Sequence, residues 1–410
     1  AEEDDLDDNG DFTSEDRGEW GGLIVLGNAV IARPGGEDGI EGIDADEARA
    51  RFGGTDNEDN SGTLRYISIR HGGAQLSTDN EINGLTLGGV GAGTTIDYVE
   101  VFANEDDGIE FFGGTVKVTH AAVSFCGDDG FDYDFGWRGG GQFWYALQGP
   151  GTGTGRSGEH DGANPDGQAP FSQPTIYNAT YVGIGNGQTA TGGDANRALP
   201  LSILFRDNAG GYYRNSIFTD FNGAAIGIED RNDTEVDAFA RFMAGDLGLS
   251  DNYFFGFGAG IDAAGLFVVV DQGEEIVATS TATLAVAMLA ANNRIIDPVL
   301  IDTDRDNDGG DIDPRPNEFG PAGFGAPAAV YGFASVSSDG AFEPAETNGN
   351  TKPSWLAGWS ALATTDIVVQ STTGIGEIEN QGLLLDAPVP NPASEVTQVN
   401  FTLPRAAQLT

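Results

Sequence analysis

Short runs of alternating apolar and polar residues recur along the chain. The clearest is DDGFDYDFGW at 128–137, where aromatic residues take every second position from Phe131 to Trp137. In an extended chain alternate side chains share a face, so the aromatic residues would lie on one face and Asp132 and Asp134 on the other. The pattern predicts a strand that packs on a core and carries carboxylates on its outer face.

The alternating runs belong to repeats. DDGIEFFGG at 106–114 recurs as DDGFDYDFG at 128–136, an offset of 22 residues, and a second group begins with asparagine at 178, 215 and 252. Self-similarity at this spacing is typical of solenoids. Short alternating strands separated by Gly, Asp and Asn, with little helix between them, indicate β-strands in each repeat. We therefore expect an all-β fold, a right-handed parallel β-helix.

Two stretches break the strand pattern. Residues 233–247 and 279–293 have apolar residues at helical spacing, which predicts short helices on loops or a lid over one end of the solenoid. A short β tail is expected at the C-terminus. The expected organisation is an acidic tail at 1–18, a β-helix domain at 19–370 with an Asp-rich calcium-type loop at 302–320, a linker at 371–382 and a partial β segment at 383–410.

Charge narrows the classes of partner. The formal net charge is −45, from 64 acidic and 19 basic residues. Such a surface repels nucleic acid and anionic lipid, and no apolar run approaches the length that spans a bilayer. Cys126 is the only cysteine, which excludes an intrachain disulfide. The chain opens on AEEDD, as a mature product does after signal-peptide removal, so we expect a secreted, extracellular or cell-surface protein.

Two segments resemble known families. The tail LLLDAPVPNPASEVTQVNFTLP at 383–404 resembles the sorting domain of type IX secreted bacterial proteins, through Asn391 and its flanking prolines and the closing Pro404. This resemblance implies passage through the outer membrane. Residues 17–31, 80–101 and 128–137 are similar to a group of secreted β-helix proteins of unassigned activity, which supports fold and export and implies no particular chemistry.

The Asp-Gly pairs occupy equivalent places in successive repeats. The 22-residue offset sets Asp106 over Asp128 and Asp107 over Asp129, on coils about 4.8 Å apart. Like charges at that separation destabilise each other. The sequence leaves three arrangements open: each pair closes a turn and hydrogen-bonds its own backbone, a calcium ion lies between the coils, or the carboxylates form a catalytic pair.

The catalytic arrangement lacks its companion motifs. Galacturonan hydrolases of the β-helix fold combine an Asp-Asp pair with Asn-Thr-Asp, Gly-His-Gly and Arg-Ile-Lys. Here the comparable motif at His71 precedes the pairs, and Arg-Ile-Lys does not occur. Lyases of this fold need a base beside calcium, for which Arg138 is the nearest candidate. We expect His120 in a strand and His160 in a loop, and assign no catalytic residue.

The strongest metal signal is DTDRDNDGGDID at 302–313. Its core from Asp304 to Gly309 matches the start of a calcium loop, in which glycine permits a sharp turn. Position twelve from Asp304 is Arg315 rather than a closing glutamate, so the segment is similar to irregular extracellular calcium repeats. A solvated acidic loop is the alternative. The predicted calcium ligands are Asp302, Asp304, Asp306, Asp308, Asp311 and Asp313.

These observations favour a non-catalytic extracellular protein, structural or adhesive, that calcium stabilises. The alternative is a β-helix protein that binds or cleaves polysaccharide, with Trp137, Trp144 and Tyr145 as an aromatic platform. Solenoid ends expose unpaired backbone, so we also expect self-association, head to tail into filaments. The C-terminal strand could add to such an edge through a run that contains Val399, Phe401 and Leu403.

Overall fold

The computed structural model describes residues 13–14, 16–40, 43, 47–76, 82–149, 155–185, 200–231, 236–303, 312–324, 332–345, 352–365, 367–369, 384–385 and 401–402. The chain forms two compact units, 1–371 and 372–410. The larger unit contains the solenoid. In the smaller unit β22 (Leu384–Leu385) pairs antiparallel with β23 (Phe401–Thr402), so Phe401 pairs inside its own unit. Val399 and Leu403 lie outside the described residues.

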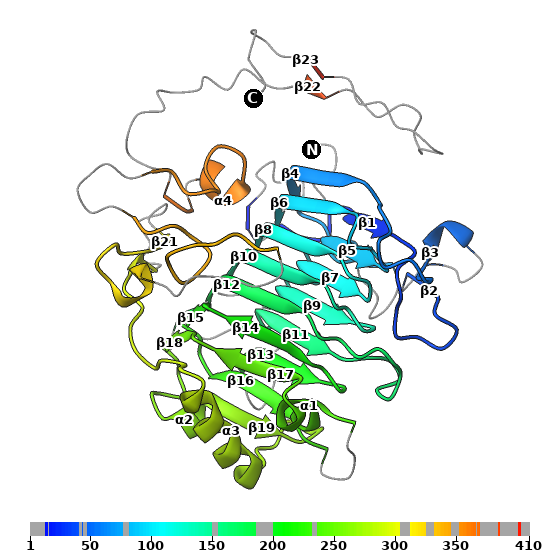
Figure 1. Cartoon of the computed structure of the whole chain (residues 1–410). Coiled ribbons are helices and arrows are strands. Elements are labelled where there is room, and N and C mark those ends of the chain that lie inside the picture. Colours follow the sequence, from blue (N-terminus) through cyan, green and yellow to red (C-terminus); the bar gives the residue numbers. More distant parts are fainter. Residues whose placement is uncertain are drawn as a thin grey trace. The chain divides into compact units, whose positions relative to one another are not determined.

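Two parallel sheets run the length of the solenoid (Figure 1). Successive strands alternate between them over most of the chain, because each coil contributes to both. The first sheet consists, in spatial order, of β1 (Leu23–Leu26), β5 (Leu85–Gly88), β7 (Ile109–Phe112), β9 (Phe131–Asp134), β11 (Gly158–Asp161), β13 (Leu201–Arg206), β16 (Ala224–Glu229) and β19 (Phe267–Val270). The second sheet consists of β4 (Thr63–Arg70), β6 (Thr95–Phe102), β8 (Lys117–Ser124), β10 (Gly140–Leu147) and β12 (Thr175–Val182), followed by β14 (Gly211–Arg214) and β17 (Leu247–Ser250) on one branch and β15 (Ile217–Thr219) and β18 (Tyr253–Phe255) on the other.

The strand pairing confirms the expected all-β parallel β-helix. Ile109 pairs in parallel with Phe131, so one coil spans the 22 residues of the sequence repeat. Thr180 pairs with Ile217 at the expected offset of 37, whereas the next coil pairs Ile217 with Tyr253, one residue shorter.

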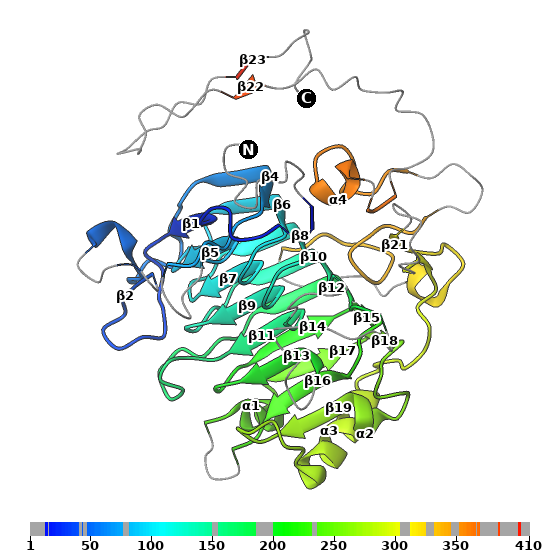
Figure 2. The same cartoon turned by 180° about the vertical axis from the view of Figure 1, so that it is seen from behind.

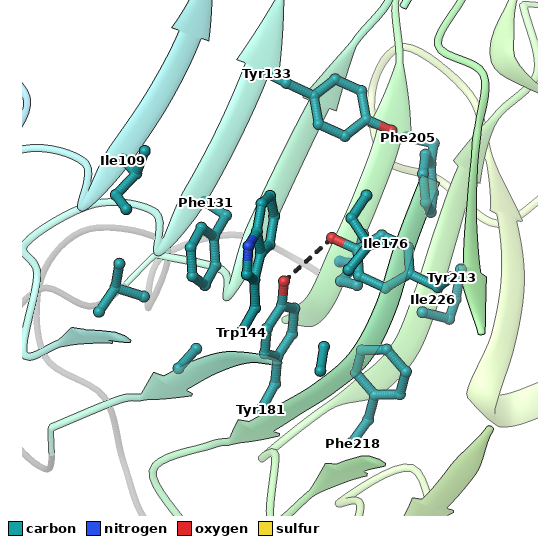
Figure 3. Packing of buried hydrophobic residues seen from close by; sticks show 14 of the residues in the cluster. Ile109, Phe131, Tyr133, Trp144, Ile176, Tyr181, Phe205, Tyr213, Phe218 and Ile226 are labelled. Carbon is teal, nitrogen blue, oxygen red and sulfur yellow. Dashed lines mark hydrogen bonds between the residues drawn. The ribbon is translucent and has the colours of Figure 1, made fainter. Parts of the chain in front are cut away.

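Inward-facing side chains of both sheets form one continuous core (Figure 3). Alternation along β9 buries Phe131 and Tyr133 and leaves Asp132 partly exposed, as the sequence predicts. Phe135 departs from the pattern because its φ of 51° turns the backbone, and its ring packs on Phe112 outside the main core.

The expected helices form near the C-terminal end of the solenoid. Asp237 caps α1 (Ala238–Ala244) by accepting a hydrogen bond from the Ala240 amide. Two further helices follow, α2 (Ala263–Leu266) and α3 (Ala278–Ala290). Among the described helices, none is long and apolar enough to cross a bilayer.

Helix α3 covers one end of the solenoid, and the strands β1 and β4 lie at the other end. At the covered end α3 packs on β19, where Thr281 Oγ1 accepts a hydrogen bond from the Val269 amide and the Val269 carbonyl accepts one from Val277. At the other end β1 and β4 are the last strands of their sheets. Head-to-tail stacking requires bare strands at both ends, and α3 covers one of them. Self-association stays a prediction.

Short strands and helices that belong to neither main sheet lie near the two ends of the larger unit's sequence. Near the N-terminus they are β2 (Asp38–Gly39), the 3₁₀-helix η1 (Ala48–Ala50) and β3 (Arg51–Phe52), with β2 and β3 antiparallel. After the last coil they are β20 (Leu300–Asp302), β21 (Asp313–Pro316), the 3₁₀-helix η3 (Pro321–Gly323) and α4 (Ala361–Thr364).

Residues 332–345 and 352–365, here called the outer segment, return along the outer face of the second sheet (Figure 2). The Ala334 amide donates to Gln142 Oε1 over 2.8 Å, and the Ala341 amide donates to Thr180 Oγ1 over 2.8 Å. The outer segment covers Tyr145, which is fully buried under Phe342.

Glu100 fastens α4 to the second sheet. Its buried carboxylate accepts hydrogen bonds from the Ala361 and Leu362 amides at 2.5 and 3.1 Å, and burial raises its pKa. Replacing Glu100 by alanine should lower the free energy of unfolding by about 2–3 kcal/mol, because two amides lose a charged acceptor. Urea denaturation measures this effect. Glu58→Ala, at an exposed acid, should change it by less than about 0.5 kcal/mol; equal effects would contradict the role of Glu100.

Candidate cation site and aromatic cavity

The Asp-Gly pairs form a ladder at one corner of the solenoid. Asp107 Oδ1 accepts a hydrogen bond from the Asp129 amide over 2.9 Å, and Asp129 Oδ1 accepts one from the Arg156 amide on the next coil. Asp107 and Asp129 are only 7% and 3% exposed, whereas Asp128 is exposed. These aspartates therefore hydrogen-bond the neighbouring coil rather than only their own turn.

Two groups of three carboxylates at this corner could hold a cation. Asp106, Asp107 and Asp128 form one group, and Asp107, Glu110 and Asp132 form the other, each with ligand oxygens within 4.8 Å of one another. Sequence reasoning missed Glu110. The signal was present, because Glu110 precedes Asp132 by the same 22 residues that separate the Asp-Gly pairs.

The second group, Asp107, Glu110 and Asp132, is called the carboxylate triad below. Burial, followed by the charges of neighbouring carboxylates, raises the pKa of Asp107 and of Asp132 well above the usual range. Oδ1 of Asp132 is buried and has no hydrogen-bond partner among the described residues. Buried ionised carboxylate oxygens without compensation are costly, so Asp107 and the buried oxygen of Asp132 favour protonation or a bound cation.

Arginines neutralise the row of carboxylates further along the first sheet. Arg206 contacts Glu159 at 2.6 Å and Asp161 at 2.7 Å. Arg156 is fully buried and contacts Glu159 and, at 2.8 Å, Glu274. Glu159 and Asp161, which follow β9, thus have cationic partners. The charged groups that raise the pKa of Asp107 and of Asp132 are instead other carboxylates.

The Asp-rich loop is described only at its two ends. Asp302 and Asp313 are paired residues in the antiparallel strands β20 and β21. The carboxylate of Asp313 holds Arg315 through contacts of 2.7 and 2.6 Å. The other predicted ligands lie outside the described residues: Asp304, Asp306, Asp308 and Asp311.

The aromatic platform expected at Trp137, Trp144 and Tyr145 is wrong, because all three side chains are buried. The indoles of Trp137 and Trp144 face inward and stack with Phe111 at centroid distances of 4.0 and 5.7 Å. Tyr145 faces outward, but the outer segment covers it. Alternating aromatic residues here fill the core rather than face a ligand.

Only one of the two histidines lies in the kind of element that the sequence predicted. His160 lies in β11 rather than in a loop, and its ring stacks on Tyr133. Its Nε2 atom is hydrogen-bonded to the Tyr213 hydroxyl over 2.8 Å. Burial lowers its pKa to about 3, so it is a neutral core residue. His120 lies in β8, as expected, and is partly exposed.

A stacked column of side chains that sequence reasoning missed runs along the second sheet. Tyr66, Tyr98, His120 and Phe143 lie on four adjacent strands, with neighbouring ring centroids 4.6, 4.2 and 4.8 Å apart. Each has a φ between 49° and 60°, which turns the backbone at the same point of these four strands. Positive φ is uncommon for aromatic residues, so alternation alone does not reveal the column.

The outer segment and this column enclose a cavity of about 430 Å³. Tyr98, His120 and Phe143 line it from the sheet, and Trp355 lines it from the outer segment. Two features therefore stand out on different sheets: a carboxylate triad on the first and an aromatic cavity on the second.

Parallel strands stacked coil upon coil, with an acidic outer corner, define a parallel β-helix protein. The chain belongs to the pectate-lyase-like β-helix domain family, whose model matches residues 10–261. This is a family of right-handed β-helices, in agreement with the expected fold. Searches of curated proteins and of solved structures found no match.

Proposed function

We propose that the protein is an extracellular, non-catalytic β-helix protein, structural or adhesive, whose solenoid is stabilised by calcium. The observation that carries the proposal is the carboxylate triad with the buried, unpartnered Oδ1 of Asp132. Calcium takes several oxygen ligands, and carboxylates supply them. The acidic composition and the sorting-domain resemblance at 383–404 support the extracellular setting.

The surroundings of the triad support a role without catalysis. A lyase needs a basic group free to remove a proton, and a hydrolase needs a carboxylic acid and a base placed about a substrate. The nearby Arg156 and Arg206 are engaged in ion pairs, and His160 is buried and neutral. A cation at the triad would instead relieve the repulsion between coils.

Calcium should raise the free energy of unfolding, by about 2.7 kcal/mol at 100 times the dissociation constant. The gain should be larger at pH 8 than at pH 5, because protons held by the raised pKa values of Asp107 and Asp132 compete with the ion. Thermal and urea unfolding with calcium or chelator, at fixed ionic strength, measure both effects.

Three variants locate the response. Asp132→Asn should remove most of it if the triad binds the ion, while a double variant with Asp304→Asn and Asp306→Asn should remove it if the Asp-rich loop does. Glu58→Gln, at an exposed acid, should leave it unchanged. An unfolding curve that calcium does not shift at pH 8 would refute the proposal.

Binding or cleavage of polysaccharide is the second candidate function. Membership of a pectate-lyase-like family favours it, since such β-helix proteins include enzymes that act on polysaccharides. The aromatic cavity supports a binding role because its lining combines aromatic rings with polar groups. The platform first expected in the sequence is buried, so a saccharide would have to bind elsewhere.

A further inference from the structure

The aromatic cavity lies on the second sheet, away from the acidic row of the first sheet. Its sheet wall is formed by Tyr98, His120 and Phe143, which come from the adjacent strands β6, β8 and β10. Trp355 forms part of the opposite wall, and Lys352 lies near it. A volume of about 430 Å³ is in the range of small-molecule sites and too small for a folded partner.

The walls of the cavity are held in place before any ligand arrives. His120 is stacked between Tyr98 and Phe143, at 4.2 and 4.8 Å. Trp355 stacks on Phe342 and meets His120 edge-on at 5.5 Å, and its indole Nε1 donates to the Ala341 carbonyl over 2.9 Å. A site with fixed walls loses little conformational entropy on binding.

Polar atoms with unused hydrogen-bonding capacity line the same cavity. His120 Nδ1 lies 2.9 Å from Asp97 Oδ1, which also accepts a hydrogen bond from Thr119. This contact orients the imidazole, and Nε2 has no partner within the described part of the chain. Ser354 also lines the cavity, and its buried Oγ has no hydrogen-bond partner among the described residues. A purely apolar ligand would leave these groups unsatisfied.

The charges around the cavity favour an uncharged ligand. Lys352 and Glu343 lie 3.5 Å apart, and Arg315 is held by Asp313, so the cations of the lining are compensated. The chain as a whole carries −45, which repels anionic ligands. The fitting ligand therefore has apolar faces for the rings and uncharged hydroxyls for the polar atoms.

We propose that this cavity binds a unit of a neutral saccharide, with the C–H face of the sugar against the aromatic walls and its hydroxyls on His120 Nε2 and Ser354 Oγ. The inference rests on the second candidate function and gives it a site. It does not depend on the carboxylate triad, because the cavity and the triad share no residue.

The test is calorimetric titration of the full chain with a panel of short neutral oligosaccharides of glucose, xylose and mannose, at pH 7 and moderate salt. At least one member should bind. Trp355→Ala should weaken that binding by about tenfold or more, and His120→Gln by a smaller factor. Phe319→Ala, which removes an aromatic ring that is 74% exposed and outside the cavity, should leave it unchanged.

Two further measurements keep the test decisive. Ser354→Val removes the hydroxyl and keeps all the aromatic rings of the cavity, and it should also weaken saccharide binding. This variant tests the proposal if Trp355→Ala fails to fold. Asp132→Asn, which weakens the calcium response if the triad binds the ion, should bind saccharide normally, which separates the two proposals. The inference is overturned if no neutral saccharide binds the folded chain, if only acidic saccharides bind, or if binding is unaffected by the cavity variants.

Discussion

Replacing Trp144 by alanine is expected to lower the free energy of unfolding by about 3–5 kcal/mol. The indole is completely buried, stacks on Phe131 at 4.3 Å and on Phe111 at 5.7 Å, and donates through Nε1 to the Val118 carbonyl over 3.0 Å. Close-packed coils cannot collapse around the missing ring, so the variant keeps a cavity. Urea denaturation followed by circular dichroism measures the change.

Phe319→Ala is the matched control for this prediction. Its ring is 74% exposed, so its removal should change the free energy of unfolding by less than about 0.5 kcal/mol. Trp144→Phe should lie between the two, because it retains an aromatic ring and loses the hydrogen bond. A Trp144→Ala protein as stable as the parent would show that the inner stack does not support the solenoid.

Replacing Arg156 by methionine should cost about 3–5 kcal/mol at pH 8. Arg156 is completely buried and is the cationic partner of Glu159 and Glu274, and its charge also lowers the pKa of Asp129. Without it these carboxylates stay buried with less compensation. Arg49→Met, which removes the exposed partner of Glu47, should leave stability nearly unchanged, because solvent screens an exposed ion pair.

The cost of Arg156→Met should shrink at pH 5. Burial raises the folded-state pKa of Asp129, so the folded protein holds a proton that the unfolded chain releases, and stability falls as pH rises through that pKa. Losing the Arg156 charge should raise that pKa further, so the variant loses less stability at pH 5, where Asp129 can stay protonated, than at pH 8. Unfolding curves of parent and variant at both pH values test this, and a cost independent of pH would contradict it.

The spacing between coils was predictable because similar segments recur along the sequence at that spacing. The 22-residue offset places Ile109 beside Phe131, and the pairing of these strands follows it. Period-two alternation correctly assigned Phe131 and Tyr133 to the core, since side-chain direction in a strand depends on backbone geometry alone. The helices at 238–244 and 278–290 were likewise visible as apolar residues at helical spacing.

Solvent exposure was not predictable in the same way. Tyr145 faces away from the inner core, yet the outer segment, nearly 200 residues later in the chain, covers it. His160 resembles a loop residue in sequence, but its neighbours Tyr133 and Tyr213 come from other coils. Burial is set by which distant residues pack on a position, and no local pattern records them.

The sequence by itself determined the parallel β-helix, the 22-residue coil between β7 and β9, and the stacking of acidic corners, because all three follow from repeats and alternation. The 22-residue repeat also pairs Glu110 with Asp132. Only the tertiary structure decided that Asp107 joins them in one triad, and that Tyr98, His120 and Phe143 stack under Trp355. Both outcomes depend on side chains from different coils or on a segment that folds back over a sheet. Their distances are set by long-range packing, which residue spacing along the chain does not encode.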